Sequence, residues 1–97
     1  MPTYITLINY TQQGIEAIED GPNRLDEARA LIESMGGTFD QWFLTMGEYD
    51  AVAVTTAPDG ATAAKSLLTI AKDGAVRTTT FEAFPEDEYR DIIAGLP

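Results

Sequence analysis

The chain has 97 residues, enough for one hydrophobic core, and its six Lys and Arg stand against sixteen Asp and Glu, giving a net charge of -10. A field of this sign repels phosphate backbones and anionic lipids, so we expect no nucleic-acid partner and no membrane partner. The sequence has no Cys and no His, which excludes disulfides, thiolate nucleophiles and Cys-type zinc sites and removes the commonest metal ligand and the usual general base. We therefore expect neither a metal nor another cofactor.

No apolar stretch approaches the roughly 18 residues that span a bilayer. The first residues also lack the basic segment and apolar core of a signal peptide. The sequence therefore predicts a cytoplasmic protein, and its length predicts a single domain over residues 1–97.

The first part of the chain predicts a strand followed by helices. β-Branched and aromatic residues at 4–10 favour the strand, and Thr11 is placed to cap a short helical turn that ends near 20–21. Pro22 suits the first position of a longer helix, and the glycine pair at 36–37 ends it. The predicted apolar face of this helix recurs at helical spacing: Leu25, Ala28, Leu31, Ile32 and Met35.

The central feature is the stretch 43–52, in which two apolar runs flank Gly47 and Glu48. Glycine at the first central position suits a two-residue type II′ turn, so we expect a hairpin over about 38–56. The turn fixes a register with these opposite pairs: Met46–Tyr49, Thr45–Asp50, Leu44–Ala51, Phe43–Val52 and Trp42–Ala53.

After the hairpin, 58–60 opens a second helix that closes at 73–74. Its predicted apolar face is Ala61, Ala64, Leu67, Leu68 and Ala71. A fourth strand follows over 75–84, and Pro85 with three acids after it begins a short last helix. The residues placed to dock that helix are Tyr89, Ile92, Ile93 and Leu96.

The order strand–helix–strand–strand–helix–strand, with a tail helix, is that of the ferredoxin-like α+β fold with a four-stranded antiparallel sheet. Both faces of the predicted sheet are apolar or aromatic, whereas two helices cover only one face. A second copy of the same sheet is the simplest cover for the other face. We therefore expect a homodimer or a larger homo-oligomer.

Gly47, Tyr49 and Asp50 match the residues that name the GYD domain, and the chain resembles this family almost from end to end. The other matching segments are TQQGI at 11–15, GPNR at 21–24, VRTTTF at 76–81 and AF at 83–84. The resemblance implies a ferredoxin-like fold related to the dimeric α/β-barrel proteins. The family has no established activity, so the resemblance leaves the function open.

Four polar residues are candidates for ligand binding, each with a structural alternative. Asp50, beside Thr45, can accept a proton or bind a ligand hydroxyl, or it accepts backbone N–H groups at the hairpin end. Arg77 is the only cation inside a predicted strand, so it holds a ligand carboxylate or pairs with an acid of its own chain or a partner. Tyr49 and Asn9 can bind ligand, or they pack and bond locally.

Aromatic residues supply the apolar part of the expected site. Tyr4 and Tyr10 share one face of the first strand, and Trp42 shares a face of the hairpin with Tyr49. If these faces look away from the helices, they line a small-molecule pocket or a dry dimer core. We expect any ligand site between the helix-free sheet face and the tail helix, with Arg77 at its polar end. The predicted ligand-binding set is Arg77, Asp50, Tyr49, Asn9, Trp42 and Tyr4.

The leading functional hypothesis is a non-catalytic oligomeric module that binds a small organic molecule or supports an assembly. The alternative is a cofactor-independent enzyme that acts on a small organic substrate in the cleft between sheet and tail helix. Its catalysis would rest on Arg77, Asp50, Asn9 and Tyr49. A regulatory domain that acts with a separate DNA-binding partner is less favoured, because the chain has no basic helix.

Overall fold

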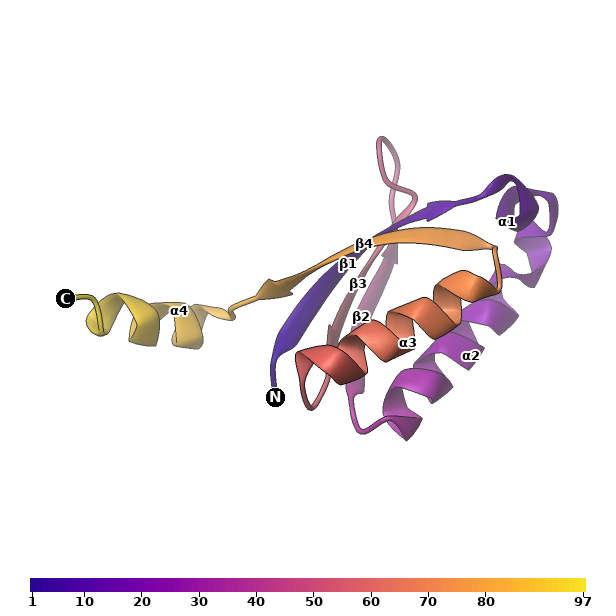
Figure 1. Ribbon diagram of the computed structural model, residues 1–97. Helices are drawn as coiled ribbons and strands as arrows, with labels where there is room; N and C mark the ends of the chain where they lie inside the picture. Colours follow the sequence, from indigo (N-terminus) through magenta and orange to yellow (C-terminus); the bar gives the residue numbers. More distant parts are fainter.

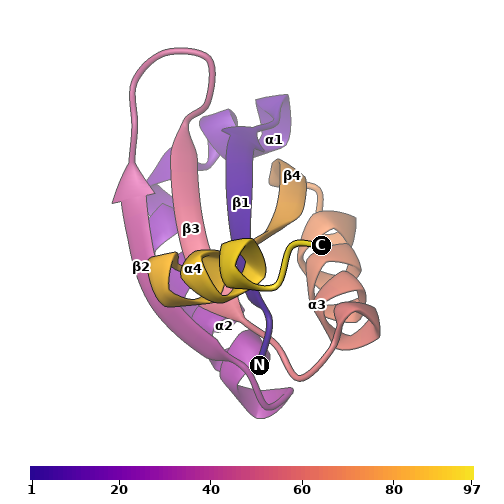
Figure 2. The ribbon, with the colours of Figure 1, turned by 90° about the vertical axis from the view of Figure 1, so that its left-hand side faces the viewer.

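Four strands form one antiparallel sheet in the computed structural model, which describes residues 1–97. The strands are β1 (Thr3–Tyr10), β2 (Thr38–Leu44), β3 (Ala51–Thr56) and β4 (Val76–Ala83). Figure 2 shows them side by side in the order β2-β3-β1-β4. This order, with two crossover helices, is that of the ferredoxin-like fold, so the predicted fold class is confirmed.

Two long helices cover one face of this sheet (Figure 1). They are α2 (Gly21–Ser34) and α3 (Gly60–Lys72). The short α1 (Gln12–Glu16) and the 3-10 turn η1 (Ile18–Asp20) connect β1 to α2. The last helix, α4 (Glu86–Ala94), projects away from the sheet beyond the end of β4 (Figure 1). No helix is long and apolar enough to cross a membrane.

The hairpin keeps the predicted register but not the predicted turn. Leu44–Ala51, Phe43–Val52 and Trp42–Ala53 are opposite pairs, as expected. The strands end there, although the N–H of Thr45 still donates to the carbonyl of Asp50 at 2.8 Å, as expected for the predicted pair Thr45–Asp50. In a two-residue turn the carbonyl of Tyr49 would accept from the N–H of Met46. Here that carbonyl accepts from Oγ1 of Thr45 at 2.6 Å, which favours the wider loop.

The strand register decides which side chains meet the helices. Tyr4 and Thr6 are buried beneath the helix layer, together with Ala53 of the neighbouring strand. The condition that Tyr4, Tyr10 and Trp42 look away from the helices is not met, because these three residues line the space between the helices and the sheet. The opposite face, here called the open sheet face, carries the alternate residues of the register: Ile5, Leu7, Phe43, Val52, Val54 and Phe81.

The helix faces were predicted with unequal success. The apolar residues predicted for α2 all line the space above the sheet. For α3, Ala61, Ala64 and Leu68 are instead exposed, Leu68 to 71%, while Ser66 is buried. Ser66 can be buried because its hydroxyl donates to the carbonyl of Thr62 at 3.1 Å. A search for apolar residues alone does not recognise such a serine as part of the buried face.

The tail helix does not dock. Its apolar residues Tyr89, Ile92, Ile93 and Leu96 are between 46% and 62% exposed. The prediction that they fasten α4 to the rest of the chain is therefore wrong for the isolated protomer.

Candidate functional site

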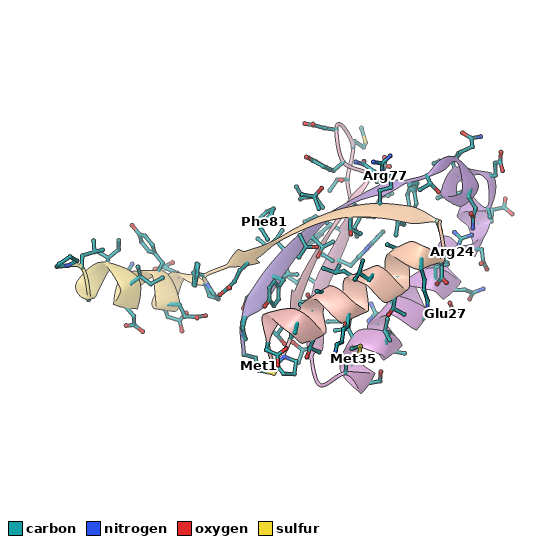
Figure 3. The ribbon with its side chains drawn as sticks, viewed as in Figure 1. Met1, Arg24, Glu27, Met35, Arg77 and Phe81 are labelled. Carbon is teal, nitrogen blue, oxygen red and sulfur yellow. The ribbon has the colours of Figure 1, made fainter.

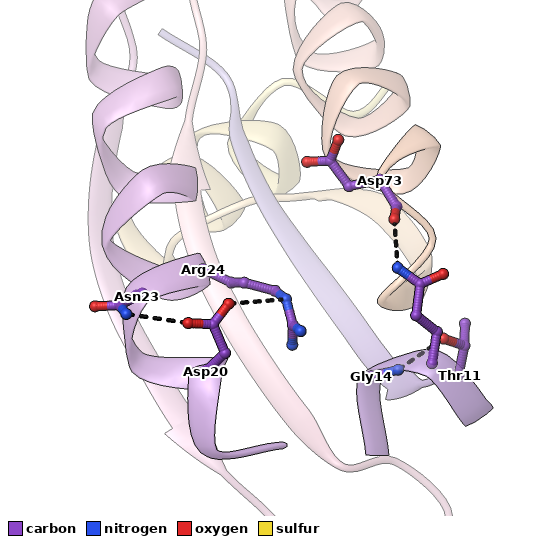
Figure 4. Close-up of polar contacts among 7 residues, drawn as sticks. Thr11, Gly14, Asp20, Asn23, Arg24 and Asp73 are labelled. Carbon is purple, nitrogen blue, oxygen red and sulfur yellow. Dashed lines mark hydrogen bonds and ion pairs between the residues drawn. The ribbon is translucent and has the colours of Figure 1, made fainter. Parts of the chain in front are cut away.

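The corner between β1 and α1 is fastened to the loop before β4 (Figure 4). The N–H of Thr11 donates to the carbonyl of Ala75 at 3.0 Å, and Nε2 of Gln13 donates to the carbonyl of Asp73 at 2.9 Å. Gly14 donates its N–H to Oγ1 of Thr11, as expected for a helix cap. A Cβ on Gly14 would lie 2.1 Å from the carbonyl oxygen of Ala75, so only glycine fits. This close approach explains why the segment 11–15 carries its glycine.

The motif Gly47, Tyr49 and Asp50 also has a structural explanation. Gly47 adopts φ +115°, a conformation that side-chain-bearing residues rarely adopt. Asp50 donates its N–H to the carbonyl of Ile8, and its Oδ2 accepts the N–H of Tyr10 at 2.9 Å. Its carboxylate therefore extends the β1–β3 pairing beyond Ala51, the first residue of β3. Two roles were predicted for Asp50, binding a proton or ligand and accepting backbone N–H groups. The structure contains the contact of the second role.

Three of the predicted site residues meet in one shallow depression. This polar recess lies where β1, β4 and the loop 45–50 come together, and its lining residues are Asn9, Tyr10, Glu48, Tyr49, Arg77, Thr78 and Thr79. Asn9 and Arg77 are direct neighbours in the β1–β4 register. Figure 3 shows the Arg77 side chain pointing away from α3, on the same side as the loop. Arg77 takes part in none of the three ion pairs within the chain.

Of the other three predicted residues, Asp50 lines neither space, and Tyr4 and Trp42 lie on the opposite face of the sheet. They line a cavity of about 180 Å³ between the helices and the sheet. Most of its lining is apolar, with Leu31, Leu67 and Ile70 among the helix residues. Apart from Asp50, the predicted set is therefore divided between a polar recess on one face and an apolar cavity beneath the other.

The predicted cleft between the open sheet face and α4 is absent from the isolated protomer. Arg77 lies near the start of β4, whereas α4 follows the end of that strand and projects away (Figure 1). Because β4 is extended, Arg77 and α4 are held far apart. The cleft that the alternative enzymatic hypothesis requires is therefore not formed.

Sequence reasoning missed Arg24, which lines the cavity at the α2 end nearest η1. Its Nε lies 3.8 Å from Oδ2 of Asp20, and Oδ1 of Asp20 accepts from Asn23 at 3.0 Å (Figure 4). Nη1 of Arg24 is buried and has no hydrogen-bond partner. The signal was present in the sequence, because Arg24, Ala28 and Leu31 fall at i, i+4 and i+7, which places Arg24 on the apolar face, one turn before Ala28.

A comparison with protein-family sequences agrees with the motif formed by Gly47, Tyr49 and Asp50. The chain belongs to the GYD domain family, whose model matches residues 4–93. Among individual relatives, the chain is 37% identical over 97 residues to the glutamine synthetase and cystathionine beta-lyase binding protein of Thermus thermophilus. That match covers 99% of both chains.

Solved structures share the fold at lower identity. The feast or famine regulatory protein of M. tuberculosis, complexed with L-methionine, superposes with a TM-score of 0.66 at 15% identity. The match covers 88% of this chain and 51% of that one, so the chain spans about half the length of the regulator. The protein TTHA0845 from Thermus thermophilus superposes with a TM-score of 0.56 at 23% identity, over 88% of this chain and 95% of that one. These likenesses establish the fold alone.

Proposed function

We propose that the chain is a non-catalytic, oligomeric binding module that attaches to an enzyme of amino-acid metabolism through its projecting helix α4. The observation that carries the proposal is an exposed apolar stripe along α4 and just past its C-cap: Tyr89, Ile92, Ile93 and Leu96. These residues occur at i, i+3, i+4 and i+7, the spacing with which an amphipathic helix enters a groove on another protein.

The rest of α4 fits this role. Three acidic residues lie in its first turn: Glu86, Asp87 and Glu88. Their negative charges stabilise the helix because they lie near the positive end of its dipole. Arg90 donates to the carboxylate of Glu86 at 2.7 Å within the same helix. The helix is therefore supported by its own polar side, and its apolar side is free for a partner.

The open sheet face is proposed to bind a second copy of the chain. Its six apolar side chains form a continuous surface across all four strands, and both long helices lie on the other side. A two-fold dimer buries the same patch from both copies, so one apolar surface suffices for both partners. Two copies would then present two α4 helices to an enzyme. The affinity of the dimer would be higher than that of one chain, because the second helix binds intramolecularly.

The identity of the enzyme is suggested by the Thermus relative. That protein is named for binding glutamine synthetase and cystathionine β-lyase, and its match includes the whole of α4. Catalysis has less support, because the carboxylate of Asp50 is already bound to the backbone of β1.

Binding to purified glutamine synthetase and cystathionine β-lyase from the same source tests the proposal. We expect the immobilised chain to bind at least one of them, and Ile92→Asp to weaken binding about tenfold or more, because a charge would be desolvated in the groove. Leu68→Asp is the matched control, since Leu68 is also apolar and exposed, to 71% against 46% for Ile92, but lies on α3. Absence of binding to both enzymes, or equal losses in the two variants, would contradict the proposal.

A further inference from the structure

The cavity between the helix layer and the sheet is large for the core of so small a chain. Its volume of about 180 Å³ is many times the ~10–15 Å³ that one water needs. No large side chain is fully buried, so neither the helices nor the strands fill the space. Closely packed cores leave few voids larger than a water molecule. A cavity of this size therefore has room for a small organic molecule.

The cavity is long and mainly apolar. It is lined by α2 from Arg24 to Met35, a separation of roughly 16 Å at 1.5 Å per residue. Figure 3 shows Arg24 and Glu27 near one end of the helix layer and Met35 near the other. Between them the lining includes Ile8 and Leu67. This part suits an aliphatic chain.

The Arg24 end of the cavity is polar and carries both signs of charge. Arg24 offers a buried Nη1 donor without a partner, and its Nε is 3.8 Å from Asp20, too far for a hydrogen bond. Glu27, one turn along α2, and Asp73, at the end of α3, also line the cavity. Figure 4 shows Arg24 and Asp73 on opposite sides of the space between the two helices. The cavity end thus has a free donor for an anion and carboxylates for a cation.

We propose that this cavity binds a small zwitterion with an apolar tail, of which an aliphatic α-amino acid is the simplest kind. The carboxylate of the ligand accepts from Nη1 of Arg24, and its ammonium group lies among the carboxylates of Glu27 and Asp73. The tail enters the apolar part of the cavity. A simple anion fits less well, because the acids that surround Arg24 outnumber it.

Trp42 provides a direct measurement, because it lines the cavity and is the only tryptophan in the chain. We expect L-norleucine to change the emission of Trp42 in a saturable manner. Three matched probes each remove one part of the ligand: hexanoate lacks the ammonium group, pentylamine lacks the carboxylate, and L-alanine lacks the long tail. Each of them should bind about tenfold more weakly or worse.

Variants assign the effect to the polar end. Arg24→Gln should weaken norleucine binding about tenfold or more, and Glu27→Gln should weaken it less, because Glu27 is more exposed. Lys65→Gln, which removes an exposed cation of α3 that does not line the cavity, should leave binding unchanged. Circular dichroism confirms that each variant is folded.

The proposal is overturned if norleucine leaves Trp42 emission unchanged at millimolar concentration. It is also overturned if hexanoate or pentylamine binds as tightly as norleucine, or if Glu27→Gln and Arg24→Gln both bind like the wild type. Because these readouts need no enzyme, their failure is separate from any failure of the proposed enzyme binding.

Discussion

At the scale of single residues, Gly14 marks the tightest approach between two segments of the fold. A Cβ added to Gly14 would lie 2.1 Å from the carbonyl oxygen of Ala75. This oxygen belongs to the backbone, so it cannot move aside as a flexible side chain can. Gly14→Ala must separate the β1–α1 corner from the loop before β4. We expect a loss of about 1–3 kcal/mol or more in the free energy of unfolding, measured by urea denaturation.

Gly60 offers the matched control for this substitution. It is the first residue of α3, and a Cβ there would make only an ordinary contact of 3.7 Å with the hydroxyl of Tyr4. Gly60→Ala should be neutral or stabilise by up to about 1 kcal/mol. Equal effects of the two substitutions would show that the contact with Ala75 does not limit residue 14.

Substitutions of Asp50 test whether this residue of the family motif has a structural role. In Asp50→Ala the N–H of Tyr10 loses its carboxylate acceptor, so we expect a loss of about 1–3 kcal/mol in the free energy of unfolding. Asp50→Asn keeps an oxygen in the same place and should lose less. If Asp50→Ala is as stable as the wild type in urea denaturation, the contact with Tyr10 is not what requires this aspartate.

At the scale of elements, the cap of α3 makes a prediction about pH. The N–H of Thr62 donates to the carboxylate of Asp59, and this bond lowers the pKa of Asp59 below its ordinary value of 3.8, with smaller contributions from the Thr62 side chain and Lys65. A lowered folded-state pKa stabilises the fold above the unfolded pKa, and this stability is lost as the pH falls through the folded pKa.

Asp59→Asn is the suitable comparison, because asparagine also caps a helix but does not titrate in this range. We expect the wild type to lose more thermal stability than Asp59→Asn when the pH falls from 7 toward 3, as measured by circular dichroism. Parallel loss in the two proteins over that range would contradict the lowered pKa of Asp59.

The elements also show how far sequence patterns determine structure. Strand alternation and the apolar spacing of α2 predicted the sheet and one helix face, because both patterns reflect burial directly. The predicted buried face of α3 was wrong because Ser66 is buried there, with its hydroxyl donating to a carbonyl of the same helix. The predicted two-residue turn at Gly47 and Glu48 was wrong because Oγ1 of Thr45 donates to the carbonyl of Tyr49, a choice between local hydrogen bonds that periodicity does not record.

The candidate site was predicted only in part, for a similar reason. Asn9, Tyr49 and Arg77 meet in the polar recess, since strand register and the hairpin loop bring them together. Trp42 was placed on the wrong side of the sheet, because a sheet with two apolar faces does not indicate which face the helices cover. Arg24 was missed because a cation at the start of a helix is usually solvated.

At the scale of the whole molecule, the open sheet face predicts self-association. Phe81 lies on that face and is 46% exposed in the protomer. In a dimer, Phe81→Asp would bury an unpaired charge, which costs several kcal/mol, so the molar mass by light scattering should fall to that of one chain. Leu68→Asp, on the outer side of α3, should leave the molar mass unchanged. A wild type that is monomeric at micromolar concentration would contradict self-association.

The most direct test of the proposed function is the molar mass of a mixture of the chain with glutamine synthetase from the same source, measured by light scattering during size-exclusion chromatography. For the wild type and for Leu68→Asp we expect a peak that is heavier than the enzyme alone and contains both proteins, and for Ile92→Asp a weaker or absent peak. Separate elution of the wild-type chain from glutamine synthetase, and likewise from cystathionine β-lyase, would contradict it.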